Sequence, residues 1–264
     1  MQELKPIIPP PPQRRDMNLT QNRLPSTSKL DGTSLELAVD GGATLEASFA
    51  DGKVTYSGTR DDGTAFAGMT AYDAVEMRPG VFFLDWADVD RMHCFTNVVD
   101  TTLGRALCMW IVIRGSGTGA KMTEMVGSAR IVGSDMPYEP IGRTRELFGK
   151  RLVCKYSDEA ALEHIYANSG VVVWQWMISP PEMGLQREVG TESAFLFKIQ
   201  DNLYQLTSRA DAPIGLLLLL DLDRKRNVGR LFGYGETAGI VEHRCGAEIT
   251  LLGEFTYPAE FQPG

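Results

Sequence analysis

Apolar and polar residues alternate along much of this chain, which is the period of a strand with one buried face. The clearest stretch is Leu45–Phe49, and a second one, Lys53–Tyr56, follows it after Asp51-Gly52. Asp-Gly between two alternating runs is the strongest short-range signal for a β-hairpin. The pattern therefore predicts an antiparallel hairpin over residues 45–56.

Similar runs predict further short strands, whereas helical periodicity is rare. The expected strands are Tyr72–Met77, Val81–Trp86, Met92–Val99, Ala106–Ile113 and Glu124–Val132. A short helix is expected at Asp158–Ala161 and one helical turn near Thr144–Leu147. Before the first strand, Pro9–Pro12 favour an extended arm, because consecutive prolines donate no ladder hydrogen bonds.

The second half of the chain repeats features of the first half in the same order. At an offset of 117 residues, Leu30-Asp31-Gly32 matches Leu147-Phe148-Gly149, Leu45-Glu46 matches Leu162-Glu163, and Phe49 matches Tyr166. Further along, with the offset grown to 125, Leu103-Gly104-Arg105 is set against Val228-Gly229-Arg230. The order of these matches indicates a duplicated structural unit.

Short strands at regular spacing in two copies predict an all-β fold of two tandem lipocalin-like antiparallel barrels with few short helices. The expected parts are a proline-rich arm at residues 1–24, a first barrel at 25–133 and a second at 146–264. A linker is expected at residues 134–145, where Pro137 and Pro140 interrupt regular structure.

The charge and the cysteine content limit which partners and which cellular location we expect. The net charge is −8 at pH 7, and the densest basic cluster is the short run Arg224-Lys225-Arg226, so no nucleic-acid partner is expected. The chain starts without the pattern of a secretory signal, and the run Ile214–Leu220 is too short to span a bilayer. No membrane partner is expected, and the four scattered cysteines predict buried, reduced thiols in a cytoplasmic protein. A homodimer stays open.

Cofactor signals are weak throughout the chain. The stretch Gly115–Lys121 is rich in glycine, but its spacing does not fit a phosphate-binding loop and strands flank it. A flexible hairpin loop is the favoured interpretation. The histidines His93, His164 and His243 are far apart, and none belongs to a spaced pair that is typical of zinc or iron sites. No cofactor and no metal are expected.

Several segments resemble the MoaF family. Asn22-Arg23-Leu24-Pro25 before a first strand, the run Leu45–Gly52, and Leu84-Asp85-Trp86 before a long hairpin are similar to its N-terminal unit, and Leu147–Tyr257 is similar to its C-terminal unit. The resemblance implies two lipocalin-like, calycin-type barrels that bind a small molecule, with a distant similarity to phenolic acid decarboxylases. It assigns no catalytic residue here, and nothing in the chain resembles a pterin or molybdenum site.

Three residues are candidates for catalysis. His93 shares a strand face with Phe95 and Asn97, and its counterparts in the second half belong to an apolar leucine run. An inward-facing imidazole there would be a natural acid or base, and an outward-facing one would simply be solvated. Asp85 on the preceding strand could orient that imidazole or act as a base itself. Arg105, matched with Arg230, would either cover a barrel end or anchor a substrate carboxylate.

Aromatic residues are candidates for the walls of a pocket, although core packing is the common role of such side chains. The expected substrate-binding residues are Tyr56, Trp86, Trp110, Trp174, Trp176 and Tyr204. Lys198, inside an apolar strand, is either a buried amine with a lowered pKa or a solvated one.

Together these features predict a cofactor-independent enzyme of small-molecule metabolism, of lyase, isomerase, hydratase or cyclase type, acting by acid–base chemistry on an apolar or aromatic substrate. A non-catalytic carrier or sensor of an apolar ligand is the alternative. A third interpretation is an interaction module that binds proteins through its arm and exposed edges. The enzyme requires two ionisable groups beside one ligand volume, whereas the carrier requires an almost entirely apolar cavity.

Overall fold

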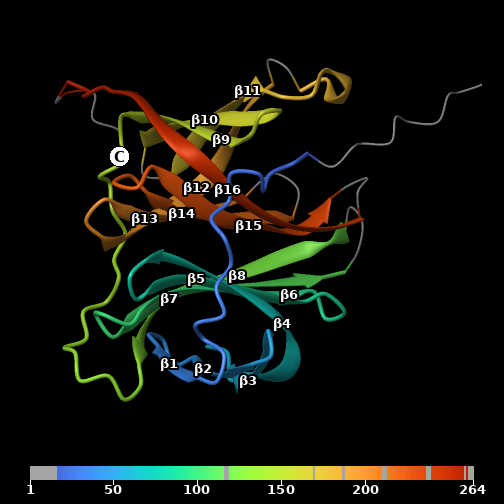
Figure 1. Ribbon diagram of the computed structural model, residues 1–264, viewed down its shortest axis with the longest axis vertical. Helices are drawn as coiled ribbons and strands as arrows, with labels where there is room; N and C mark the ends of the chain where they lie inside the picture. The colour runs from blue at the N-terminus through green and yellow to red at the C-terminus, as the bar shows by residue number, and fades with distance from the viewer. Residues whose placement is uncertain are drawn as a thin grey trace, which may run out of the picture.

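The computed structural model describes residues 17–115, 119–168, 170–185, 188–209, 213–235, 239–258 and 260. The prolines Pro9–Pro12 and residues 116–118 of the glycine-rich stretch lie outside the described residues. The described chain folds into two closed, antiparallel barrels of eight strands each. Figure 1 shows one barrel above the other. The predicted fold class is therefore confirmed.

Barrel 1 follows the order of the chain around its circumference, and β1 pairs with β8 to close it. Its strands are β1 (Ser34–Val39), β2 (Thr44–Ala50), β3 (Lys53–Thr59), β4 (Ala65–Arg78), β5 (Val81–Asp88), β6 (His93–Asp100), β7 (Arg105–Arg114) and β8 (Lys121–Ile131).

Barrel 2 repeats this arrangement, and β16 pairs with β9 to close it. Its strands are β9 (Lys150–Ser157), β10 (Ala160–Asn168), β11 (Val171–Ile178), β12 (Val189–Gln200), β13 (Leu203–Arg209), β14 (Ile214–Asp221), β15 (Arg226–Gly235) and β16 (Gly239–Glu254). The 3₁₀ turn η2 (Pro181–Met183) lies between β11 and β12.

The hairpin at Asp51-Gly52 forms as predicted, with φ angles of 51° and 70° at its two turn residues. A two-residue turn with positive φ at both positions matches the right-handed twist of the strands that it joins. The expected helix at Asp158–Ala161 is wrong, because Asp158 and Glu159 form the tight turn between β9 and β10. Residues 144–147 likewise form no helix.

The repeat of 117 residues is visible in the strand register. Leu37 pairs with Leu45 in barrel 1, and Cys154 pairs with Leu162 in barrel 2. The amide of Gly32 donates to the carbonyl of Phe49 at 2.7 Å, and the amide of Gly149 donates to that of Tyr166 at 3.0 Å. The two barrels therefore begin with the same hydrogen-bonded corner.

The pairing of Arg105 with Arg230 is wrong. Arg105 begins β7 opposite Asp100, and Arg226 begins β15 opposite Asp221, so Arg226 is the structural counterpart of Arg105. Arg230 lies four residues further along β15. The predicted offset of 125 residues was too large, because Gly104-Arg105 and Gly229-Arg230 lie at different places along their strands.

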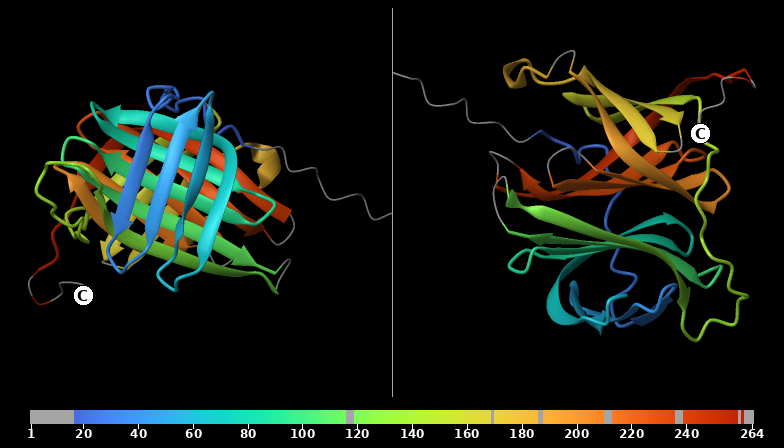
Figure 2. Two further views of the ribbon diagram at one scale, coloured as in Figure 1. Left: turned by 90° about the horizontal axis from the view of Figure 1, so that it is seen from below. Right: turned by 180° about the vertical axis from the view of Figure 1, so that it is seen from behind.

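The barrels pack against each other through the outer faces of their middle strands. An apolar layer joins β5, β6 and β7 of barrel 1 to β12–β15 of barrel 2, and it includes Phe83, Met109, Leu217 and Phe232. These strands are consequently buried on both faces, one toward the barrel interior and one toward the other barrel. Figure 2 shows the two barrels stacked, with the linker running along one side.

Residues 18–29, here named the strap, cross the boundary between the two barrels (Figure 1). The backbone N–H of Asn22 donates to Tyr156 O of barrel 2 at 2.9 Å, and the backbone N–H of Gly246 donates to Leu19 O at 2.9 Å. Further along the strap, Arg23 forms an ion pair with Asp73 of barrel 1. The strap thus binds both barrels by main-chain and charged contacts.

All four cysteines are buried and unpaired, as the sequence predicts. Among the described residues, no helix has the length and apolar character needed to cross a bilayer.

Candidate functional site

His93 lies at the end of barrel 1 that holds the β3–β4 and β5–β6 connections and the last residues of β7. It begins β6 and shares the inward strand face with Phe95, which belongs to the core of the barrel. Its ring lies 6.4 Å from that of Phe95, and the side chain is partly buried. Of the two orientations left open by the sequence, the inward one is therefore the one found.

Three further side chains gather beside His93 at this end. Asp88, at the end of β5, is the cross-strand partner of His93. It accepts a hydrogen bond from Tyr56 Oη at 3.3 Å and an ion-paired hydrogen bond from Arg91 Nη1 at 2.8 Å. Burial and then the Asp88 carboxylate raise the pKa of Tyr56 to about 12. Tyr56 is thus a protonated hydrogen-bond donor at neutral pH.

Arg60 approaches His93 from the β3–β4 loop, with 3.4 Å between Nη2 and the imidazole Nε2. Because a guanidinium only donates, this contact suits a neutral imidazole that accepts at Nε2. Burial and then the Arg60 charge lower the pKa of His93 below its usual value of 6.5. Arg60 forms no ion pair within the described part of the chain, so its charge is available to an anion.

A cavity of about 480 Å³ lies beside Asp88 and Arg91. It occurs where β4 leaves β5: residues 65–71 of β4 pair with β3, and residues 72–78 pair with β5. The remaining lining comes from Gly68, Met69, Thr70, Ala87, Val89 and Asp90. The bend of β4 therefore opens space next to a group of ionisable side chains.

Five aromatic rings fill the barrel below these polar groups. They are Tyr56, Phe66, Trp86, Phe95 and Trp110, with neighbouring centroids 5.1–6.3 Å apart. The expected pocket residues Tyr56, Trp86 and Trp110 thus pack together, each at most 3% exposed. Trp110 Nε1 donates to Asn97 Oδ1 at 3.1 Å, while Trp86 Nε1 and Asn97 Nδ2 have no partner among the described residues.

Asp85 does not belong to this site. It pairs across β5 and β6 with Thr96, on the face opposite to His93, and that face lies against barrel 2. There it forms a fully buried ion pair with Arg230, which also bonds Glu242 at 2.6 Å. Burial raises the pKa of Asp85, and the Arg230 charge opposes this rise. Asp85 is therefore in no position to orient the His93 imidazole.

Arg105 is also separate from His93, because the two residues lie at opposite ends of the β6–β7 hairpin. With a rise of about 3.3 Å per residue, roughly 20 Å separates them, too far for one small substrate. Arg105 donates to Ile199 O at 2.7 Å and to Glu139 O at 3.1 Å, which ties the linker and barrel 2 to barrel 1.

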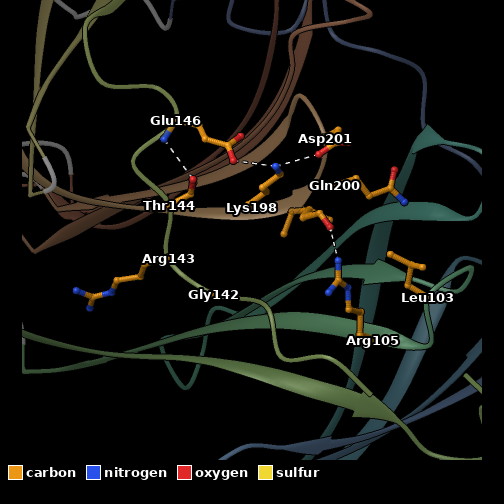
Figure 3. Close-up of a pocket in the computed structure, with 10 residues that line it drawn as sticks. Leu103, Arg105, Gly142, Arg143, Thr144, Glu146, Lys198, Gln200 and Asp201 are labelled. Atoms are coloured by element: carbon orange, nitrogen blue, oxygen red, sulfur yellow. Dashed lines mark hydrogen bonds and ion pairs between the residues drawn. The ribbon is translucent and has the colours of Figure 1, made fainter. Parts of the chain in front are cut away.

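Figure 3 shows the groove of about 510 Å³ in which Arg105 lies. Lys198 forms ion pairs there with Glu146 at 2.8 Å and Asp201 at 2.9 Å, and these hydrogen bonds raise its pKa. Of the two interpretations of Lys198, the solvated amine is the one found. Its two carboxylate partners leave it unsuited to act as a base.

The remaining predicted residues belong to barrel 2. Trp174 and Trp176 of β11 point inward, opposite His164 and Leu162 of β10. Tyr204 also packs in this interior and donates to Glu146 Oε2 at 2.8 Å. These aromatics are thus far from His93. The six predicted substrate-binding residues therefore belong to two separate barrel interiors.

Sequence reasoning missed Asp88, Arg91 and Arg60. The segment Asp88–Arg91 is a charged tip between two strands, and such tips are usually only solvated, so composition alone gave no reason to select it. Within the described ranges, no three histidine, cysteine or carboxylate side chains gather as they would around a metal ion.

Comparison with known proteins assigns a family to both halves. The MoaF N-terminal domain matches residues 18–114, and the MoaF C-terminal domain matches residues 141–255. No curated protein matches the chain. One crystal structure, described as that of "a putative beta-lactamase from Burkholderia vietnamiensis", aligns with 42% of this chain and 100% of its own, at 10% identity and a TM-score of 0.36. That likeness is too weak to support an inference. The first match covers β1–β7 of barrel 1 and the second covers all of barrel 2, and this chain belongs to the MoaF family.

Proposed function

We propose that the end of barrel 1 around His93 is an acid–base site for a small organic substrate with an apolar or aromatic body. The observation that carries this proposal is the meeting of His93, Asp88, Tyr56 and Arg60 above a floor of aromatic rings, where Asp88 also lines a cavity. Two ionisable groups within reach of one ligand volume are what an enzyme of this kind requires.

His93 is the proposed base. Its lowered pKa keeps the imidazole neutral at pH 7, so it is ready to accept a proton. Arg60 now occupies the lone pair at Nε2. A substrate anion that attracts the Arg60 guanidinium would free Nε2 to take a proton from carbon or oxygen, and the arginine would then stabilise the developing negative charge.

Tyr56 is the proposed hydrogen-bonding group that orients the substrate. Its hydroxyl is held by Asp88, and Arg91 in turn fixes the Asp88 carboxylate through its side chain and its backbone amide. A base that takes a proton from one atom of a substrate can return the same proton to another atom, while fixed polar groups hold the substrate in place. This supports a lyase, isomerase, hydratase or cyclase reaction in small-molecule metabolism.

A carrier or sensor function is the second candidate. It is favoured by the two unpartnered polar atoms beneath the site, Trp86 Nε1 and Asn97 Nδ2, which could bind a ligand without reacting with it. Under this alternative, substitution of His93 leaves ligand affinity unchanged.

The test begins with native mass spectrometry of the protein purified from its source, which identifies a retained molecule. Turnover of that molecule, or hydrogen exchange into it from D₂O, is then followed by NMR. We expect His93→Gln to lower kcat/KM by about 100-fold or more, since a positioned base contributes about that factor. The wild-type kcat/KM should rise with pH through an apparent pKa below 6.5, as neutral His93 forms.

His243→Gln is the matched control, because His243 is exposed on β16 of the other barrel. It should leave kcat/KM unchanged. If His93→Gln reacts as fast as the wild type, the proposed base is wrong. If the retained molecule binds but is neither converted nor exchanged, the carrier replaces the enzyme.

A further inference from the structure

The interior of barrel 2 is polar at positions where barrel 1 is apolar. The shared register sets His164 against Ala47 and Tyr166 against Phe49 in the first hairpins. In the seventh strands, the positions after Arg226 and Arg105 are Asn227 and Ala106. The same fold thus forms in barrel 1 with apolar side chains at these three positions.

These three side chains are buried and carry polar atoms that lack a hydrogen-bond partner of normal geometry among the described residues. His164, Tyr166 and Asn227 are exposed by 3%, 1% and 0%. His164 Nδ1, Tyr166 Oη and both amide atoms of Asn227 make no hydrogen bond of normal geometry with any described residue. Burying such atoms costs free energy unless something pairs with them, and nearly all buried polar groups have a partner.

The side chains that carry these atoms lie next to one another on the inner face of barrel 2. The His164 and Tyr166 rings lie 6.4 Å apart, and the Tyr166 hydroxyl is near the Cys154 thiol. The Asn227 amide faces the Cys154 thiol and the Tyr156 hydroxyl, and its interaction with each of them acts to lower the pKa of that group against the effect of burial. Opposite His164 on β11, Trp174 adds a buried Nε1 that also lacks a partner. Donors and acceptors therefore converge from β9, β10, β11 and β15.

The end of β11 leads from this lining to the surface. Trp174 and Trp176 are partly buried, and the next two residues, Met177 and Ile178, are 50% and 42% exposed. Trp174 lies directly over Gly190 of β12, where any larger residue would collide with the indole ring. The tryptophans thus form a wall between solvent and the polar interior.

We infer that barrel 2 binds a small uncharged molecule with an aromatic or apolar body and one or two hydrogen-bonding groups. The lining supplies a phenol, an amide, an indole N–H and an imidazole, and none of these offers a permanent charge to a charged ligand. Burial lowers the pKa of His164 to about 4, which keeps this imidazole neutral. The site is independent of His93 and its barrel.

The test uses the full chain with p-cresol, benzamide and cyclohexanol as neutral probes, and with benzoate and benzylamine as charged ones. Binding is followed by tryptophan fluorescence and by the shift in melting temperature. At least one neutral probe should raise the melting temperature, and the charged probes should not. Tyr166→Phe and Asn227→Leu should each weaken that binding about threefold to tenfold, the loss expected for one hydrogen bond.

Tyr166→Phe should also melt at a higher temperature than the wild type when no probe is present, because it removes an unpaired buried hydroxyl. Tyr138→Phe is the matched control. Its hydroxyl donates to Asp40 Oδ2 at 2.8 Å, so its loss should lower the melting temperature without changing probe affinity. The inference is overturned if no neutral probe binds, or if Tyr166→Phe and Asn227→Leu bind the probe as the wild type does.

Discussion

His93 and His164 both point into a barrel, but their surroundings give them different properties. Around His93, the charged groups Arg60, Asp88, Arg91 and Arg114 all act on the imidazole. Around His164, the cross-strand neighbours are Leu152 and Trp174, and burial alone lowers the pKa. The first histidine is thus available to chemistry, whereas the second one bears on the stability of the fold.

His164 should make the protein sensitive to acid. Its pKa is about 4 in the folded state and 6.5 as the reference value, so between these values the unfolded chain binds a proton that the folded chain does not. This contribution to stability is complete above pH 6.5 and is lost as the pH falls towards 4. The loss should reach about 3 kcal/mol, from roughly 1.4 kcal/mol for each unit of pKa difference.

Urea unfolding between pH 7 and pH 4 measures this effect. The difference in the free energy of unfolding between the wild type and His164→Phe should change across that range by the amount given above. His243→Gln, which removes an exposed histidine, should give a flat difference curve. A flat curve for His164→Phe would mean that the folded protein protonates His164 readily.

Among the elements, the glycine before the first strand of each barrel has the same backbone conformation in two different surroundings. Gly32 and Gly149 occupy equivalent positions with φ angles of 80° and 78°, a region that favours glycine. A Cβ atom on Gly32 would meet nothing within 4 Å, whereas one on Gly149 would collide with the Phe255 carbonyl. The backbone requirement is shared, and the packing requirement exists only in barrel 2.

Alanine substitutions separate the two requirements. Gly32→Ala should cost about 1–2 kcal/mol, the strain of a left-handed backbone at a residue with a Cβ atom. Gly149→Ala carries the same strain and in addition must displace the segment after β16, so its cost should be clearly larger. Chemical denaturation of both variants measures the two losses in the free energy of unfolding. Equal losses would show that the segment after β16 moves aside without a cost.

At this scale the sequence was informative, because hairpins depend on local residues. The Asp51-Gly52 turn and the repeat of 117 residues could both be identified from turn residues and alternating apolar positions. Arg105 was matched with the wrong arginine, since only strand pairing shows that Asp100 and Asp221 face the first residue of the next strand. The prediction of a helix at Asp158–Ala161 was wrong, because the two-residue turn at Asp158 and Glu159 is too short to leave a periodic pattern in the sequence.

At the scale of the whole molecule, the barrel–barrel contact decides what several residues do. In β5, residues 81–87 are all buried, because one face meets the barrel interior and the other meets barrel 2. Alternation disappears from such a strand, so the sequence could not show that Asp85 faces away from His93. The polar groups around Asp88 were missed for a related reason, since only the closed barrel brings the tips of separate hairpins together.

The buried pair of Asp85 and Arg230 should be important for holding the barrels together. Arg230→Met leaves the Asp85 carboxylate buried without its main partner, and we expect a loss of about 3–5 kcal/mol in the free energy of unfolding. Replacing both residues, as Asp85→Leu with Arg230→Met, should recover most of that loss, because no unpaired charge then remains.

Arg226→Met provides the comparison on the same strand. Its ion pair with Glu248, at 2.9 Å, is partly exposed on both sides, so its removal should cost about 1 kcal/mol or less. Thermal unfolding followed by circular dichroism measures all three variants. An Arg230→Met protein as stable as Arg226→Met would show that water reaches Asp85.

The strap has a consequence for the order in which a newly made chain can mature. Residues 18–22 are synthesised before any strand of barrel 1, yet their main-chain partners, Tyr156 and Gly246, belong to β9 and β16 of barrel 2. Domains generally fold as units during translation, the N-terminal one first. The strap must therefore wait, and it can make these contacts only after the strands of barrel 2 have been synthesised.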